Sequence, residues 1–213
     1  MIKIATFTFN PFAENTYVIY DESGEAVIVD PGNYEPEEDR QLSDFIAENE
    51  LRPVLVANTH AHVDHVLGVS YVKRAWGIPF ALHPGDEPTL RSVKVYAPHY
   101  GFNAYEEAEV DQRLQEGGKI TFGSSEMDII FVPGHAPGHV AFYSKAHGML
   151  LAGDVLFRGS IGRTDLPGGN HQTLIRSILE KIFVMPDDVT VYPGHGPSTT
   201  VGFEKKNNPF FRF

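Results

Sequence analysis

The sequence contains no cysteine among its 213 residues. This absence excludes disulfide bonds, thiolate metal ligands and a cysteine nucleophile, so a metal ion would have to be held by histidine and carboxylate side chains. There is also no run of about 18 apolar residues that could span a bilayer. Residues 1–5 lack the charged and long apolar regions of a signal peptide. We therefore expect a cytoplasmic protein without a membrane partner.

Positive charge is scarce, since 17 Lys and Arg residues face 28 Asp and Glu residues and the net charge is -11. Nucleic-acid binding draws on clustered basic side chains, so we expect no nucleic-acid partner. The apolar fraction of 42% and the charged fraction of 21% are ordinary for a folded globular protein. The length and the lack of a linker or low-complexity tract predict one domain over residues 1–213, as a monomer or a homodimer.

The pattern of apolar residues predicts strands that alternate with a few helices. Alternating or β-branched runs predict strands at residues 2–9, 16–20, 26–29, 53–57, 78–82, 119–122, 127–132, 140–143, 149–152 and 189–192. One-sided apolar stripes predict helices at 36–50, 66–76 and 171–183. The four strands from residue 119 onward, separated by turn residues, predict a β-meander. Residues 83–118 show the least clear pattern, although residues 83–86 are expected to open a short helix. The apolar tail 208–213 could pack on the body or on a second subunit.

The densest chemical feature is the stretch Thr59-His60-Ala61-His62-Val63-Asp64-His65, which follows the strand predicted at 53–57. Neutral imidazole and carboxylate are the ligands of zinc and similar divalent metals. In extended backbone His60 and His62 point to the same side, whereas the adjacent Asp64 and His65 must diverge. This spacing suggests two metal ions. A polar surface run or one structural metal ion is the alternative.

Three further stretches place a potential ligand just after an apolar strand and a glycine. These potential ligands are His135 after Gly134, Asp154 after Gly153, and His195 after Gly194. Glycine allows a close backbone approach that a side chain would block. Asp30 also ends a predicted strand. It is either a turn residue or a group that orients a ligating histidine.

With these residues in this order, the sequence resembles the metallo-β-lactamase superfamily over essentially its whole length. The segments 134–139, 153–157 and 162–169 resemble its glyoxalase II-like (hydroxyacylglutathione hydrolase-like) branch. The resemblance implies an α+β fold, an αβ/βα four-layer sandwich of two mixed β-sheets with helices on the outer faces.

The resemblance also implies a dinuclear site. His60, His62 and His135 would hold one divalent metal ion, Asp64, His65 and His195 the other, and Asp154 would bridge them. His139 would lie behind these ligands without binding metal. Zinc is the expected metal, with iron or manganese as alternatives. The metal ions would lower the pKa of bound water to roughly 7, so that hydroxide is available as a nucleophile. Hydroxide bridging the metals would attack a carbonyl carbon, and Asp64 or Asp154 would move the proton.

The implied activity is hydrolysis of a thioester such as S-lactoylglutathione. Arg163, in a glycine-rich loop, could bind a substrate carboxylate through its planar fork, or could pair with Asp165 instead. The longer glyoxalase II enzymes carry a C-terminal helical extension and a tyrosine shortly after the last histidine. Here Gly196-Pro197-Ser198 follows His195 and the chain ends 18 residues later. Whether glutathione is the thiol is therefore left open.

Three alternatives share this fold or these ligands. A mononuclear iron persulfide dioxygenase would need only His60, His135 and Asp154. A lactonase or lactamase would use the same hydroxide. A non-catalytic metal-dependent binding module would use the ligands without turnover. The retained Asp64, His65 and His195 favour a second metal and the hydrolase.

Overall fold

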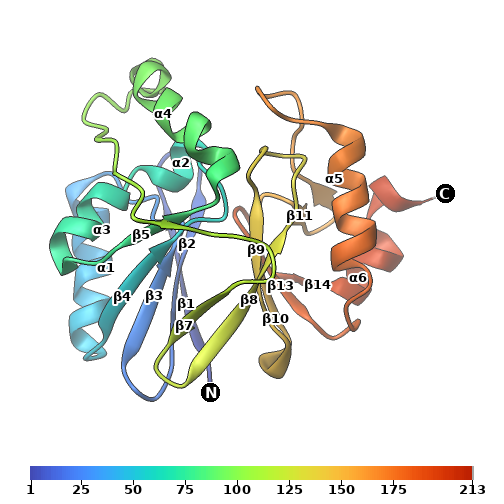
Figure 1. The fold of residues 1–213 in the computed structure, drawn as a ribbon, viewed down its shortest axis with the longest axis horizontal. Coiled ribbons are helices and arrows are strands. Elements are labelled where there is room, and N and C mark those ends of the chain that lie inside the picture. The colour runs from blue at the N-terminus through green and yellow to red at the C-terminus, as the bar shows by residue number, and fades with distance from the viewer. Residues whose placement is uncertain (213) are drawn as a thin grey trace.

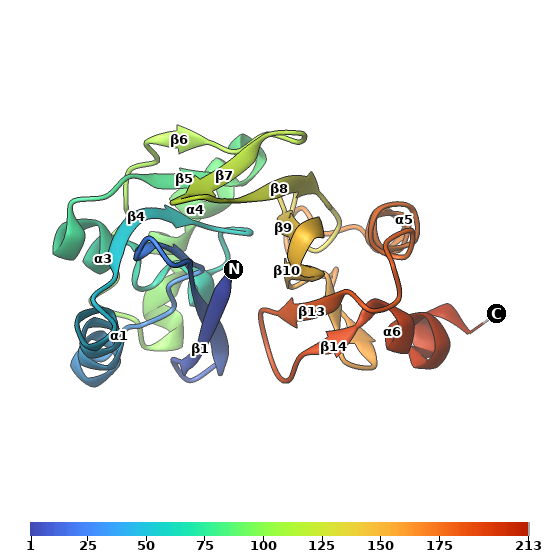
Figure 2. The ribbon, with the colours of Figure 1, turned by 90° about the horizontal axis from the view of Figure 1, so that it is seen from below.

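The computed structural model describes residues 1–212 and contains two six-stranded sheets packed face to face (Figures 1 and 2). The first sheet has β1 (Lys3–Phe9), β2 (Glu14–Tyr20), β3 (Glu25–Val29), β4 (Arg52–Ala57), β5 (Phe80–Leu82) and β6 (Gln112–Arg113), in this order. Its first three strands are antiparallel neighbours, and β3 to β6 run parallel.

The second sheet contains the predicted meander. Its order is β14 (Thr199–Thr200), β13 (Thr190–Pro193), β10 (Met149–Gly153), β9 (Val140–Ser144), β8 (Ser125–Phe131) and β7 (Lys119–Phe122). The strands β7 to β10 are antiparallel in chain order, whereas β13 joins β10 in parallel. Both sheets are thus mixed. The short strands β11 (Leu156–Phe157) and β12 (Ser160–Ile161) pair with each other outside them.

Helices cover the outer faces of the two sheets. The first sheet carries α1 (Pro36–Glu48), α2 (Val63–Val66), α3 (Val69–Trp76) and α4 (Glu87–Tyr96), and the second carries α5 (His171–Ser177) and α6 (Val201–Asn207). The short helical turns are η1 (Pro84–Asp86), η2 (Ala97–Tyr100), η3 (Lys145–His147), η5 (Pro209–Phe211) and the π-helical η4 (Ile178–Ile182), which continues α5. The α+β four-layer sandwich that the sequence predicted is confirmed.

Three apolar layers hold these elements together, and β3 shows how the sequence builds them. Ala26 and Ile28 face the layer under the helices, while Val27 and Val29 face the layer between the sheets. A parallel strand that is buried on both faces needs an unbroken apolar run, which is what residues 26–29 provide. The third layer lies between the second sheet and its helices.

The structure differs from the predicted elements mainly in its helices, and the tail takes one of the two positions that the sequence left open. The helix predicted at 66–76 begins earlier and is divided into α2 and α3 around Gly68, where a side chain would overlap with Asn33. The short helix expected to open at residues 83–86 is found as η1 and α4, whereas α6 was not predicted. In the tail, Phe211 packs on Phe183 of the body with ring centroids 4.7 Å apart, and Phe213 lies outside the described residues.

Within residues 1–212, every helix is too short or too polar to cross a bilayer.

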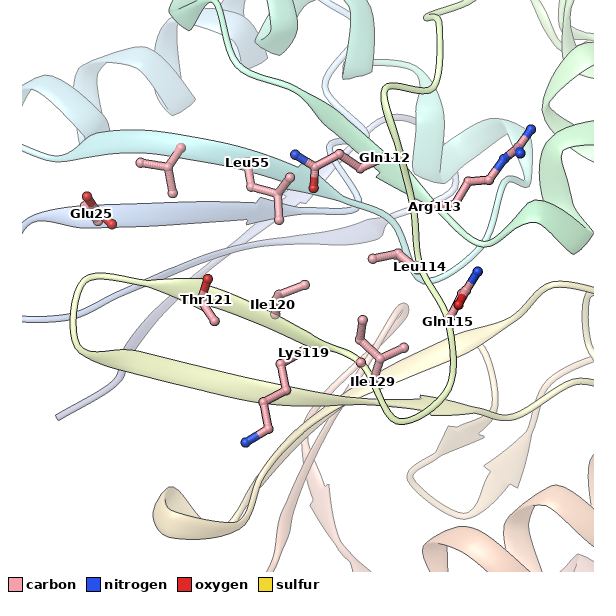
Figure 3. Close-up of a pocket in the computed structure, with 12 residues that line it drawn as sticks. Glu25, Leu55, Gln112, Arg113, Leu114, Gln115, Lys119, Ile120, Thr121 and Ile129 are labelled. Carbon is pink, nitrogen blue, oxygen red and sulfur yellow. The ribbon is translucent and has the colours of Figure 1, made fainter.

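A cleft of about 500 Å³ opens beside the chain segment that crosses from β6 to β7 (Figure 3). Its floor is apolar, since Leu55, Leu114 and Ile120 belong to the layer between the sheets. None of the histidines or carboxylates predicted to bind metal lines this cleft. The residues predicted to bind metal lie elsewhere, at the ends of the strands.

Asp21 joins the turn after β2 to the turn before β8. Its carboxylate, on a residue that is 3% exposed, accepts hydrogen bonds from the backbone and hydroxyl of Ser23, from those of Ser124, and from the hydroxyl of Ser125. Although desolvation raises the pKa of this carboxyl, the hydrogen bonds from Ser23, Ser125 and Ser124 together hold it well below its ordinary value. We expect Asp21→Asn to lower the free energy of unfolding by about 1 to 3 kcal/mol at pH 7.

The pH dependence of that loss has a defined sign. A lowered pKa stabilises the fold fully above the unfolded-state value of about 3.9, and this contribution is lost progressively as the pH falls from there through the lower pKa of the folded state. Urea unfolding of metal-free protein should therefore show the stabilities of the two proteins approaching each other as the pH falls below about 4. Asp128→Asn, at a carboxylate whose side chain is 49% exposed, is the control and should change stability by less than about 0.5 kcal/mol. An Asp21→Asn protein as stable as this control would contradict the prediction.

Candidate metal centre

The histidine-rich stretch lies where β4 ends and α2 begins. His62 has extended backbone, with φ -66° and ψ 155°, and caps the first turn of α2, so that Asp64 and His65 follow on helical backbone. This change of backbone directs the two pairs differently. The peptide before them is fixed because the Thr59 carbonyl accepts a hydrogen bond from Val140 of β9.

Two groups of three potential ligands come together at this point. Within each group the ligand atoms lie within 4.8 Å of one another. The groups are His60, His62 and His135, and Asp64, His65 and His195. Each contains members from both halves of the sandwich, so the centre exists only when the two sheets are packed together. Whether these residues ligate metal stays a prediction.

Asp154 lies between the two groups, directly after β10. One of its carboxylate oxygens is 3.6 Å from Nε2 of His135 in the first group. The same oxygen is 3.5 Å from Nε2 of His195 in the second, and the other oxygen is 3.5 Å from Nε2 of His65. This is the position that a carboxylate shared by two metal ions requires.

The outer ring nitrogens of four histidines are held by oxygen atoms of the protein. The pairs are His60 Nδ1 with Thr59 Oγ1 at 3.0 Å, His65 Nδ1 with Asp30 Oδ2 at 3.2 Å, His135 Nδ1 with the Arg163 carbonyl at 2.8 Å, and His195 Nδ1 with the Phe12 carbonyl at 3.1 Å. A carbonyl or carboxylate oxygen can only accept, and the Thr59 hydroxyl already donates its proton to Asp30, so these Nδ1 atoms carry the proton. In a neutral ring, Nε2 then presents its lone pair to the centre.

Asp30 orients one histidine of each group. Its carboxylate accepts the backbone and hydroxyl protons of Thr59, both at 2.6 Å, which leaves the Thr59 oxygen to accept from His60. It also accepts directly from His65. The residue has a left-handed backbone with φ 50°, a conformation that costs energy and is found at functional sites. Of the two roles left open from the sequence, the contacts fit the orienting one.

Three buried atoms of the centre show that a cation fits it. Nε2 of His60, Nε2 of His65 and Oδ1 of Asp154 have no hydrogen-bond partner among residues 1–212. Buried polar atoms are rarely left unpaired, because their desolvation is costly. Lone pairs from imidazole and carboxylate that converge without hydrogen-bond donors suit a divalent metal ion.

Burial and charge shift the protonation of these ligands in opposite directions. Burial lowers the pKa of His62 to about 3 and that of His60 well below its ordinary value, so both are neutral as ligation requires. Burial also acts to lower the pKa of His195, but hydrogen bonds to Asp154 and Asp64 raise it to about 9. A metal ion would displace that proton.

His139 lies behind the centre and outside both groups. Its Nε2 accepts a hydrogen bond from the backbone of Asp154 at 3.1 Å, and its ring stacks on His60 with centroids 4.7 Å apart. These contacts correspond to the position behind the ligands that the resemblance implied. They support the peptide of Asp154 and the ring plane of His60 without supplying a ligand.

The glycines directly before His135, Asp154 and His195 allow the backbone to lie close to neighbouring groups. A Cβ at Gly194 would overlap with Asp154 and lie 2.7 Å from the His65 ring. Gly153 has φ 49° and lies under His139, and Gly134 has φ 134° and lies against the backbone of α5. The reason for the repeated strand, glycine and ligand pattern is thus visible as close backbone contact.

Arg163 takes the second of the two roles considered from the sequence. Its guanidinium donates two hydrogen bonds of 2.8 Å to the carboxylate of Asp165, and both side chains are exposed to solvent. Its contribution to the centre is its backbone carbonyl, which holds His135. The structure does not bring its side chain to the ligands.

Two buried carboxylates were missed by the sequence reasoning. Glu14 at the start of β2 is fully buried, and its carboxylate lies 3.8 Å from Nδ1 of His65. Desolvation raises its pKa well above the ordinary value. Asp86 accepts hydrogen bonds from the backbone of Ala61 and of Gly138, and so ties together the two loops that carry the first ligand group. The feature that could have revealed Glu14 is a single acidic residue at the start of a strand that is buried on both faces.

Comparison with known proteins gives a family for this chain. Residues 9–195 match the model of the metallo-β-lactamase superfamily. The probable metallo-hydrolase YqgX of Bacillus subtilis (strain 168) is 36% identical over 94% of this chain and 93% of its own. The hydroxyacylglutathione hydrolase GloC of Haemophilus influenzae is 35% identical over 98% of both chains.

Solved structures agree with this family. The BLEG-1 B3 metallo-β-lactamase has a TM-score of 0.88 and 34% identity, and the match covers 99% of this chain and 100% of that one. TTHA1623, solved in a di-iron-bound form, has a TM-score of 0.85 and 38% identity over 97% of this chain and 99% of that one. With two sheets, outer helices and His/Asp clusters at the strand ends, the chain belongs to the metallo-β-lactamase superfamily of metallo-hydrolases.

Proposed function

We propose that this protein is a dinuclear metal-dependent hydrolase that cleaves a hydroxyacyl thioester such as S-lactoylglutathione. The observation that carries the proposal is the position of Asp154 between two complete three-residue groups, within 3.5 to 3.6 Å of histidines from both. A mononuclear site would not need Asp64, His65 and His195 to converge on the same carboxylate.

The residues of the centre divide the work of hydrolysis. Two divalent metal ions, zinc in the first instance and iron or manganese as alternatives, would supply a water of lowered pKa and a positive field for the carbonyl oxygen. Asp64 and Asp154 are the carboxylates at the reacting centre that can take up a proton. The released thiol has an ordinary pKa near 8.5, so it can leave as a thiolate without a strong general acid.

The name of the relative GloC supports the thioester, since that protein is called a hydroxyacylglutathione hydrolase. A lactamase is the second candidate, because the BLEG-1 structure is similar over the whole chain and is called a B3 metallo-β-lactamase. The same ligands would serve a lactonase. The two names differ in the substrate that they indicate, and for this chain we propose that the residues around the ligand groups select the acyl substrate.

Metal analysis followed by a substrate panel tests the proposal. Protein grown in defined medium should hold two metal ions per chain and should hydrolyse S-lactoylglutathione or another thioester with loss of activity on chelation. One iron ion per chain with oxygen uptake on glutathione persulfide would replace the hydrolase with the persulfide dioxygenase. Turnover of lactams or lactones alone would move the proposal to those substrates. Tight ligand binding without any turnover would indicate a binding module.

A further inference from the structure

The turn between β1 and β2 is strained and is fixed beside the metal centre. Asn10 and Ala13 have left-handed backbones with φ 51° and 55°. The Asn10 side chain donates to the carbonyls of Gly32 and Asp64, both at 3.0 Å, and its backbone donates to Glu38 at 2.7 Å. Strain of this kind persists only where the surroundings impose it, and it concentrates at functional sites.

The turn presents Phe12 to the centre in two ways. Its carbonyl accepts the Nδ1 proton of His195, while its ring stays 40% exposed. The ring lies edge-on to Tyr100 at a centroid distance of 5.5 Å and is supported by Phe102 at 5.9 Å. Tyr100 belongs to η2, far away in the chain, and is 55% exposed. Two unrelated segments thus place exposed aromatic rings together beside a predicted metal ligand.

Other aromatic side chains continue this surface. Phe157 of β11 lies 6.2 Å from the His195 ring, and Tyr96 of α4 lies 6.1 Å from Tyr100. Burial raises the pKa of Tyr96 to about 12, and Asp64 adds to the shift. The side of the centre around His195 is therefore bordered by aromatic rings.

Arg163, the cation near these rings, adds little net charge to the surface because its guanidinium is paired with Asp165 through two hydrogen bonds. These hydrogen bonds raise the pKa of the guanidinium. A substrate carboxylate would meet a closed ion pair at this point. Apolar contact is the recognition that the exposed rings offer.

We propose that Phe12 and Tyr100 form an aromatic rim that binds an apolar, planar group directly beside the thioester carbonyl. The inference rests on the proposed thioester hydrolysis and adds to it a preference for thioesters with an aryl or similarly bulky apolar group. The group can belong to the acyl arm or to the thiol arm, and matched substrates distinguish the two.

The test compares substrates that differ only in the apolar group. S-Mandeloylglutathione and S-lactoylglutathione share the thiol and the 2-hydroxyacyl unit, and differ by phenyl in place of methyl. Lactoyl thioesters of benzyl mercaptan and of ethanethiol place the same difference on the thiol arm. For the arm that meets the rim, the wild-type kcat/KM should be about tenfold higher with the phenyl group. Phe12→Ala and Tyr100→Ala should each remove most of this preference, mainly through KM.

Two features separate recognition from a structural effect. The carbonyl that holds His195 is backbone, so the Phe12→Ala protein should keep its full metal content, and Tyr100→Ala tests the same rim from a different segment. Phe210→Ala removes a ring of similar exposure, 46%, from η5 and should leave the preference unchanged. Equal turnover of phenyl and alkyl substrates, or equal loss on all substrates in both variants, would overturn the rim alone. A metal-loaded protein that cleaves no thioester would overturn the proposed function as well.

Discussion

Replacing Asp154 with alanine is expected to remove at least one metal ion per chain and to lower kcat/KM by about a thousandfold or more. Asp154 is the only side chain that lies within 3.6 Å of histidines from both ligand groups among the contacts of the described residues. Without its carboxylate, the two groups would lose the ligand that we propose they share, and with it one of the two negative charges that would offset the metal ions. Metal content after dialysis and steady-state thioester hydrolysis measure the two losses.

The control for this prediction is a carboxylate near the centre that has no ligand role. Asp165→Ala is suitable, because the Asp165 side chain is 68% exposed and contacts only the Arg163 guanidinium by ion pairing in residues 1–212. It should keep full metal content. Two tightly held metal ions and full activity in the Asp154→Ala protein would contradict the bridging position.

The divergence of the two pairs His60/His62 and Asp64/His65 follows from local backbone rules, which is why the spacing indicated it, whereas the remaining members of each group were expected from the family resemblance. His60 and His62 are two residues apart in extended backbone, and α2 then turns Asp64 and His65 in another direction. His135, Asp154 and His195 each follow a strand of the second sheet, and strand ends of packed sheets meet at one edge. The meander β7 to β10 was equally accessible, because its pairings join neighbours in the chain.

The residues that hold the ligands in place were not accessible in the same way, since their partners are remote in sequence. Asp86 binds the backbone of Ala61 and of Gly138, and nothing in the local sequence 83–87 indicates either contact. The Phe12 carbonyl reaches His195 across nearly the whole chain. Every residue has a backbone carbonyl, so the residue type does not indicate which carbonyl accepts a hydrogen bond, and only the packed structure reveals it. Short helices such as α6, with a glycine in the first turn, are also set by packing.

Close packing against Asp154 and His65 explains why glycine stands between the end of β13 and His195. A Cβ at this position would overlap with Asp154 Oδ1 and lie 2.7 Å from the His65 ring, and Gly194 is not among the residues with positive φ. Alanine there is thus acceptable to the backbone but not to the centre. We expect Gly194→Ala to displace the Asp154 carboxylate. It should also weaken metal binding by the group of Asp64, His65 and His195 by about 10- to 100-fold. The fall in thioester hydrolysis should follow the loss of that metal ion.

Gly196 provides the control that separates the effect of this close contact from the effect of backbone strain. It has φ 73°, and a Cβ added there would meet no atom within 4 Å, so Gly196→Ala should cost about 1 kcal/mol of stability and leave both metal ions in place. Calorimetric titration of metal-free protein with Zn²⁺ gives the two affinities, and urea unfolding of the metal-free variants gives the stabilities. Gly194→Ala should show the reverse profile, with a larger loss of metal affinity than of stability. If both variants instead lost stability alike and bound two zinc ions as tightly as wild type, close approach at Gly194 would have no part in forming the centre.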